Sequence, residues 1–195
     1  MRFKTTNFTI LSIIFAICLS ASAIVSAAES YKIDTVHSFV IFRIKHLGVS
    51  YSYGRFNDLS GTFIMDEKEI SKSTVDVTIK VDSIDTHHAK RDGHLKGPDF
   101  FNAKAFPVIN FKGKKFKKVG SEKVQVTGDL LLHGVKKSIT VEMTHIGSGK
   151  DPWGGYRSGF EGVFKIKRSD FGMNYMPEGI GDEVTIGLGI EGIRQ

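Results

Sequence analysis

The most regular stretch of the sequence is Thr74-Val75-Asp76-Val77-Thr78-Ile79-Lys80-Val81-Asp82. Polar and apolar side chains alternate through its whole length, which places the three valines and the isoleucine on one face of a β-strand. All four apolar residues are β-branched, and such side chains suit a pleated sheet better than a helix. The stretch therefore predicts a strand that packs on a core with one face and meets water with the other.

The same alternation recurs in seven further segments. They cover residues 36–46, 53–66, 107–118, 123–133, 139–145, 155–167 and 183–193. Short turn sequences such as 119–122 join neighbouring segments, so the strands should pair antiparallel. Eight long antiparallel strands would leave two exposed sheet edges, and closure of the sheet removes both. We therefore predict an all-β fold, a closed antiparallel β-barrel of about eight long strands.

Several glycines stand inside strand patterns rather than in turns. They are Gly128, Gly162, Gly187 and Gly189. Glycine inside a strand marks a bend, a bulge or a close approach of another segment, so we expect these positions to help the sheet curve.

Residues 87–101 break the period of two. We predict a short helix over residues 87–95 with Leu95 turned inward, followed by the aromatic pair Phe100 and Phe101. A long, aromatic-rich connection in a barrel of otherwise short links is typical of a lid, so we expect this segment to close one mouth of the barrel.

The first 27 residues have the features of a secretory signal peptide. Two basic residues precede an apolar run over residues 8–19, and small residues follow it. The run is short for a membrane-spanning helix, so we predict cleavage after Ala27, within one residue, and export to the periplasm. The only cysteine, Cys18, would leave with the signal. Residues 28–195 must then fold as one domain without disulfides, which their length allows.

The chain is mildly basic, with 27 Lys and Arg against 21 Asp and Glu. Lysines are frequent over residues 112–118, where Phe111 and Phe116 interleave with them, a composition that also suits nucleic acid. Export argues against that partner, and alternating lysines on a hairpin arm are typical of a solvated face at a sheet edge. We therefore predict no nucleic-acid partner, while a transient contact with membrane lipids or a membrane protein stays open.

The histidines and serines form no recognised metal or catalytic motif. Residues 28–195 offer no cysteine for a zinc site, and His37 and His46 are nine residues apart, on opposite faces of a regular strand. His37 and Ser38 would also face opposite sides, and neither a nucleophile elbow nor a phosphate-binding glycine loop occurs. We therefore predict no metal site and no enzymatic activity.

Five ordered motifs span almost all of residues 28–195. They are His37-Ser38-Phe39-Val40-Ile41-Phe42-Arg43-Ile44-Lys45-His46-Leu47-Gly48-Val49-Ser50 with Gly54-Arg55-Phe56, Arg91-Asp92-Gly93-His94-Leu95 with Asp99-Phe100-Phe101 and Pro107, Gly128-Asp129-Leu130 with Gly134-Val135, Arg168-Ser169-Asp170-Phe171-Gly172-Met173, and Gly181-Asp182-Glu183-Val184. Together they resemble the YceI-like family of exported polyisoprenoid-binding proteins. Asn102, Leu131 and Lys136 depart from residues that are common in the family, Asp at the first position and Thr at the other two.

The resemblance implies a lipocalin-like barrel with an apolar interior, a periplasmic or secreted location and no catalysis. It implies a long amphiphilic ligand, namely a polyisoprenoid, an isoprenoid quinone or a fatty-acid derivative. This lipid would bind non-covalently, and no other cofactor is expected. The protein would carry or sequester it.

Strand alternation divides the side chains of each segment between two faces but leaves open which face lines the pore. For the apolar tail we predict Phe42, Phe56, Phe63, Leu95, Phe101, Phe111, Leu132, Phe160, Phe164 and Met173. For a polar head group at the mouth we predict Arg91, His94 and Arg168, which offer donors to a phosphate or a quinone oxygen.

Two alternatives stay open. An enzyme could use the neighbourhood of Arg91, Asp92 and His94, or the protein could be an accessory that carries a quinone to a redox partner. The sequence also leaves open the identity of the lipid and the formation of a homodimer.

Overall fold

The computed structural model describes residues 28–195, which contain eleven β-strands, one α-helix and three short 3-10 helices. The strands are β1 (Glu29–Ile33), β2 (Phe39–His46), β3 (Ser50–Phe56), β4 (Leu59–Met65), β5 (Thr74–Lys80), β6 (Ile84–Asp85), β7 (Val108–Lys118), β8 (Lys123–Leu132), β9 (Val135–Lys150), β10 (Tyr156–Lys167) and β11 (Ile180–Arg194). The helix α1 covers Ala89–Lys96, and the 3-10 helices are Ile70–Lys72, Val81–Ser83 and Arg168–Phe171.

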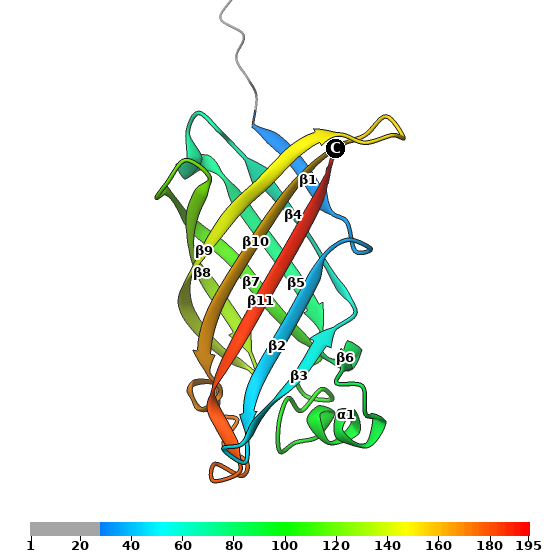
Figure 1. Cartoon of the computed structure of the whole chain (residues 1–195). Helices are drawn as coiled ribbons and strands as arrows, with labels where there is room; N and C mark the ends of the chain where they lie inside the picture. The colour runs from blue at the N-terminus through cyan, green and yellow to red at the C-terminus, as the bar shows by residue number, and fades with distance from the viewer. Residues whose placement is uncertain (1–27) are drawn as a thin grey trace, which may run out of the picture.

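The sheet is antiparallel throughout the described residues and closes on itself (Figure 1). The hydrogen-bonded order is β1-β4-β5-β7-β8-β9-β10-β11, and β11 pairs back with β1. β1 and β2 pair with different parts of β11, so together they occupy one place in the wall. β4 pairs with β1 and β3 pairs with β2, so β3 and β4 together occupy the next place. The wall therefore has eight places, and the predicted antiparallel barrel is confirmed.

Two local features let the sheet turn and curve. The β8–β9 hairpin has a two-residue turn, His133-Gly134, in which both residues are left-handed, with φ of 51° and 74°. Gly128 of β8 pairs with Gly113 at a bulge of β7, and a Cβ at Gly128 would lie 2.3 Å from the Lys112 carbonyl oxygen. A side chain at Gly128 would therefore force the two strands apart where the wall bends.

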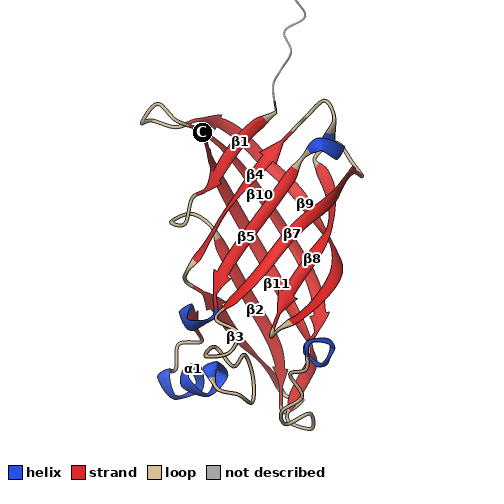
Figure 2. Cartoon of the chain, turned by 180° about the vertical axis from the view of Figure 1, so that it is seen from behind, coloured by secondary structure: helices blue, strands red, loops and turns tan. Residues whose placement is uncertain are grey.

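The barrel has two different ends. At the first, called the β1 end here, β1 pairs with both β4 and β11. At the other, the α1 end, lie α1, the β2–β3 turn and the loop 172–179 before β11 (Figure 1, and Figure 2 from behind). The predicted short helix at one mouth is confirmed over Ala89–Lys96, and its Leu95 is half-buried against the core.

The wall is less complete at the α1 end. Within the described residues, the edge of β3 that faces away from β2 pairs only with β6, through Arg55 and Phe56. The segment after α1 packs against the same strand through Phe101, whose ring lies edge-on to that of Phe56 at 5.6 Å. Side chains, rather than main-chain hydrogen bonds, thus close the barrel there.

Three details differ from the prediction. The short strand β1 was not expected. The predicted strand 36–46 begins only at Phe39, because residues 34–38 form a corner in which Asp34 Oδ1 accepts the Val36 N–H at 2.9 Å. The predicted segment 53–66 is divided into two strands, because β3 ends at Phe56 and β4 begins at Leu59.

The lysines of β7 are exposed as expected. The pairing of β7 with β5 ends at Lys112, so Lys115, Lys117 and Lys118 lie in a part of β7 that pairs, among the described strands, with β8 alone.

The predicted signal peptide, residues 1–27, lies outside the described residues. Within residues 28–195, no helix is long and apolar enough to cross a membrane.

Candidate functional site

The barrel encloses a cavity of about 460 Å³. Inward-facing side chains of β2 to β5 and of β7 to β11 supply most of its wall, and nearly all of them are apolar. Many of these residues are only partly buried although they point inward, as Phe111, Phe160 and Leu188 show. Side chains in a close-packed core would be fully buried, so the barrel interior is hollow rather than filled.

Every residue that the sequence suggested for ligand contact lines this cavity. The apolar set is Phe42, Phe56, Phe63, Leu95, Phe101, Phe111, Leu132, Phe160, Phe164 and Met173, and the polar set is Arg91, His94 and Arg168. The structure therefore brings residues from strands, the helix and loops that lie far apart in the chain into one lining. That they contact a ligand stays a prediction.

Aliphatic residues of the wall were not singled out from the sequence. They include Val75, Val77, Ile79, Ile109, Val126, Leu130, Ile139, Val141, Ile186, Leu188 and Ile190. Their signal is the strand alternation itself, which marks each of them as one face of a strand without saying that the face is hollow.

Aromatic rings cross the barrel interior toward the β1 end. Tyr31 stacks on Phe63 at 4.8 Å, and Phe63 packs edge-on against Phe160 at 5.6 Å. The ring of His145 then lies 5.0 Å from Phe160. Since β4 and β10 are not neighbours in the sheet, this row of rings bridges the interior and narrows it at the β1 end.

The cavity opens at the α1 end. Its most exposed lining residues, apart from Thr74, are Lys45, His46, Tyr53, Arg91, His94, Tyr175 and Met176. All seven lie on the β2–β3 hairpin, on α1 or in the loop 172–179, so these three segments form the mouth.

Hydrogen bonds to Thr86 hold α1 in place over the mouth. Asp92 accepts the Thr86 N–H at 2.8 Å and also the Thr86 hydroxyl. Arg91 donates through Nε to Thr86 Oγ1 at 2.8 Å and through Nη2 to the Thr86 carbonyl at 2.6 Å. The Asp92 carboxylate is thus turned onto Thr86, and His94 Nε2 is paired with Asp99 Oδ2 at 2.9 Å.

Three rings meet at the mouth. His94 lies 5.0 Å from Phe100 and 5.2 Å from Tyr175, and Phe100 lies 5.3 Å from Tyr175, each pair edge-on. Tyr175 belongs to the loop 172–179, so this cluster joins that loop to the α1 segment across the opening. Edge-to-face ring pairs contribute modest energy, so the contact can close the mouth and still open.

The buried residue Arg168 fixes the loop at the mouth. Its guanidinium donates to three main-chain carbonyls, those of Met173 at 2.7 Å, Gly181 at 2.9 Å and Ile180 at 3.0 Å. Burial lowers the pKa of Arg168, while Asp182 nearby opposes the shift. With these bonds in place, Arg168 positions the loop first and has fewer N–H groups left for a ligand.

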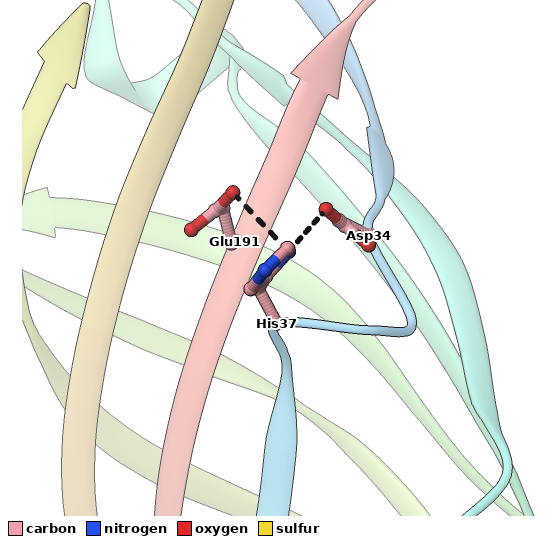
Figure 3. A group of neighbouring side chains, drawn as sticks. All are labelled: Asp34, His37 and Glu191. Atoms are coloured by element: carbon pink, nitrogen blue, oxygen red, sulfur yellow. Dashed lines mark hydrogen bonds and ion pairs between the residues drawn. The ribbon is translucent and has the colours of Figure 1, made fainter. Parts of the chain in front are cut away.

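A separate group of polar residues fastens the corner between β1 and β2 to β11 (Figure 3). His37 Nδ1 lies 2.8 Å from Asp34 Oδ2 and 4.0 Å from Glu191 Oε1. In the described part of the chain, this is the one group with the composition of a metal site. The place of a cation is taken, however, because Arg157 Nη1 lies 2.5 Å from both Asp34 Oδ2 and Glu191 Oε1.

These residues form an ion-pair network. Burial raises the pKa of Asp34, but hydrogen bonds from His37 and Arg157 outweigh it and leave that pKa well below its ordinary value. The Arg157 hydrogen bond likewise lowers the pKa of Asp151, whose Oδ2 accepts Arg157 Nε at 2.9 Å. The network joins β10, β11 and the corner after β1 on the outside of the barrel, away from the cavity.

A known protein family matches this sequence over nearly the whole barrel. The family model is described as a YceI-like domain and covers residues 31–192. The chain belongs to the YceI-like family. Among its relatives, a UPF0312 protein of Pseudomonas aeruginosa is 48% identical over 170 residues, which cover 86% of this chain and 88% of the relative. Protein YceI of Salmonella paratyphi B is 43% identical over 197 residues and covers both chains in full.

Solved YceI-like structures have the same barrel. BcnA of Burkholderia cenocepacia superposes with a TM-score of 0.75 at 26% identity, over 82% of this chain and 98% of that one. The YceI protein of Campylobacter jejuni gives a TM-score of 0.68 at 34% identity, over 77% and 90%. A polyisoprenoid binding domain from Saccharophagus degradans gives 0.66 over 85% and 98%, and its 18% identity supports the shared fold alone.

Proposed function

We propose that the protein binds a long-chain amphiphilic lipid, a polyisoprenoid, isoprenoid quinone or fatty-acid derivative, and carries or sequesters it in the periplasm. The observation that supports this most directly is the hollow, apolar barrel interior of about 460 Å³ with its mouth at one end. A cavity of this size and character suits an elongated apolar ligand. The predicted leader, residues 1–27, would direct the chain to the periplasm.

Desolvation of the lipid tail would supply the affinity. Each buried methylene contributes about 0.8 kcal/mol, so ten of them contribute about 8 kcal/mol before ordering costs. No hydrogen bond to the tail is needed. A head group would stay at the mouth beside Arg91 and His94, where the Arg91 N–H groups that Thr86 does not engage remain as donors.

Binding without catalysis agrees best with the mouth geometry. Arg91 and Asp92 are both committed to Thr86, and His94 is paired with Asp99. An enzyme would need at least one of these groups aimed at the reacting atom. We therefore expect His94→Ala to leave lipid binding intact, and loss of a measurable turnover on the bound lipid would favour the enzyme instead.

Native mass spectrometry tests the binding, with organic extraction of protein isolated from its own periplasm. One long-chain lipid per barrel is the expected result, and its head group separates a polyisoprenoid carrier from a quinone-linked accessory. Protein that arrives empty and also takes up no added polyisoprenoid or quinone would contradict the proposal.

A matched pair of variants on β11 links binding to the cavity. Ile186 lines the cavity, whereas its neighbour Thr185 alternates to the outer face. Ile186→Trp should fill the interior and abolish lipid uptake, while Thr185→Trp should bind as the wild type does.

A further inference from the structure

Large apolar and aromatic side chains are exposed around the mouth. They are Leu47, Val49, Tyr51, Tyr53, Tyr175 and Met176, of which the least exposed, Tyr175, keeps 41% of its surface accessible. All six come from the β2–β3 hairpin and the loop 172–179. A group of exposed apolar side chains gathered in one place marks an interaction surface, whereas scattered ones do not.

The two segments form one continuous rim. The Leu47 N–H donates to the Gly179 carbonyl at 2.7 Å, and His46 pairs with Ile180. Both segments reach the same extremity of the barrel, beyond the ends of β2 and β11 (Figure 1). We call Leu47, Val49, Tyr51, Tyr53, Tyr175 and Met176 the apolar rim.

The backbone at one rim residue points to a partner. Leu47 is left-handed, with φ of 49°, a conformation that glycine or asparagine adopts more readily. Met176 is left-handed too, but its side chain lines the cavity, whereas the Leu47 side chain is exposed and does not. An exposed apolar side chain gains nothing from water, so burial of Leu47 against something outside the molecule would explain a leucine at this position.

Basic residues accompany the apolar rim. Lys45 lies beside it on β2, the Arg43 guanidinium sits over the Tyr51 ring at 4.7 Å, and Lys90 and Lys96 lie on α1. No ion pair within residues 28–195 involves Lys45, Lys90 or Lys96. In the loop itself Glu178 carries the opposing charge. Unpaired lysines beside exposed apolar tips complement an anionic surface with an apolar layer beneath it.

We propose that the apolar rim docks the barrel, mouth first, on a bilayer surface of anionic phospholipids. Leu47, Val49 and Met176 enter the headgroup layer, and tyrosines are at home at this depth. The lysines face the phosphates. In this orientation the cavity opens toward the bilayer, so a lipid could pass between the two without crossing water. That last consequence rests on the proposed function, whereas docking itself does not.

Cosedimentation with vesicles tests the docking. The protein used is residues 28–195, without the predicted signal peptide. We expect this part to fold alone, because the superposition on BcnA includes 98% of that chain and 82% of this one. We expect it to bind vesicles that contain phosphatidylglycerol more tightly than vesicles of phosphatidylcholine alone, with binding that weakens as salt is added. Protein that stays in the supernatant with both kinds of vesicle would overturn the proposal.

The left-handed backbone offers a variant that should not harm the fold. Leu47→Asn suits the left-handed conformation at that residue, and Val49→Ser removes a second rim side chain; neither residue lines the cavity. We expect this double variant to unfold at the same or a higher urea concentration and to bind phosphatidylglycerol vesicles about tenfold more weakly or worse. The matched control is Trp153→Ser, because Trp153 is 79% exposed on the β9–β10 hairpin at the β1 end. Equal binding by both variants, or loss only in Trp153→Ser, would refute docking by the rim.

Native mass spectrometry on the same samples separates this proposal from the proposed function. A double variant that keeps its bound lipid but leaves the vesicles supports rim docking apart from lipid binding. A barrel that never holds lipid yet binds vesicles through the rim refutes the carrier function and leaves the docking intact.

Discussion

The two ends of the barrel are held together by different interactions. At the β1 end, the wall is held by main-chain ladders on both sides of β1, a row of packed rings and the ion pairs of Arg157. At the α1 end, side-chain contacts replace part of the ladder, and apolar side chains remain exposed. Most of the ladder, ring and ion-pair interactions described above thus lie away from the mouth. The mouth can therefore open for a ligand without disrupting them.

The largest expected effect lies at the β1 end. Phe63 is 6% exposed and contacts both Tyr31 and Phe160, so Phe63→Ala removes the centre of the ring row and should lower the free energy of unfolding by about 4 kcal/mol. Phe164 is half-buried and faces the hollow interior, so Phe164→Ala should cost about 2 kcal/mol or less. Urea unfolding followed by circular dichroism measures both. Equal losses would mean that the two ends are packed alike.

A second large effect concerns the fixed part of the mouth. Arg168→Met leaves three carbonyls without their donor and should cost about 3 kcal/mol of unfolding free energy. The adjacent residue Lys167 is exposed, and Lys167→Met should change stability by no more than about 0.5 kcal/mol. If Arg168→Met unfolds at the wild-type urea concentration, the loop 172–179 is held by something other than this guanidinium.

The ion-pair network predicts how stability depends on pH. Asp34 and Asp151 have pKa values lowered in the folded state, so the stability they contribute is complete above their ordinary pKa of about 4 and is lost as the pH falls below it. Arg157→Met removes the partner they share. We expect a smaller loss than for Arg168→Met, because Arg157 lies nearer to solvent.

Thermal unfolding of both proteins between pH 3 and pH 7 checks this, because the loss should begin near about pH 4 and should grow as the pH falls further. The Arg157→Met midpoint temperature should fall less steeply with acid than that of the wild type. Parallel curves would show that the lowered carboxyl pKa values do not depend on Arg157.

Of these variants, the one at Tyr175 should have the smallest effect on stability and the largest effect on the rate at which a bound lipid is released. Tyr175 closes the mouth through two ring contacts and is 41% exposed, so Tyr175→Ala should cost about 1 kcal/mol or less. Release of a bound fluorescent fatty acid into excess unlabelled lipid should nevertheless become faster. Val163→Ala, at an exposed position of β10 outside the rim and the cavity lining, serves as the control. Unchanged release would mean that the ring cluster is not what closes the mouth.

Most of the barrel follows from local patterns. The alternation that begins at Thr74–Asp82 predicts the strands, and the predicted ligand residues on strands, such as Phe42 and Phe160, reach the cavity because alternation puts them on one face. Those on α1 and in the loops reach it only through the way these segments pack at the mouth. Predicting that the interior is hollow requires the register of all eight places in the wall. The corner at residues 34–38 was missed for a similar reason, since it is fixed by Arg157, which lies far along the chain. The direction of Asp92 toward Thr86 likewise depends on how α1 packs.

The incomplete ladder beside β3 has a consequence for amide hydrogen exchange. Amides of β8, β9 and β10 sit in ladders on both sides and should exchange only when the whole barrel unfolds. Amides of β6, α1 and the outer edge of β3 become exposed to water once the side-chain contacts of this region separate. They should therefore exchange through local opening, and urea should hardly change their exchange rate. The region of β6, α1 and the outer edge of β3 can therefore open while the rest of the barrel stays folded. If a ligand enters the cavity beside this region, the rate of local opening would limit the rate of entry.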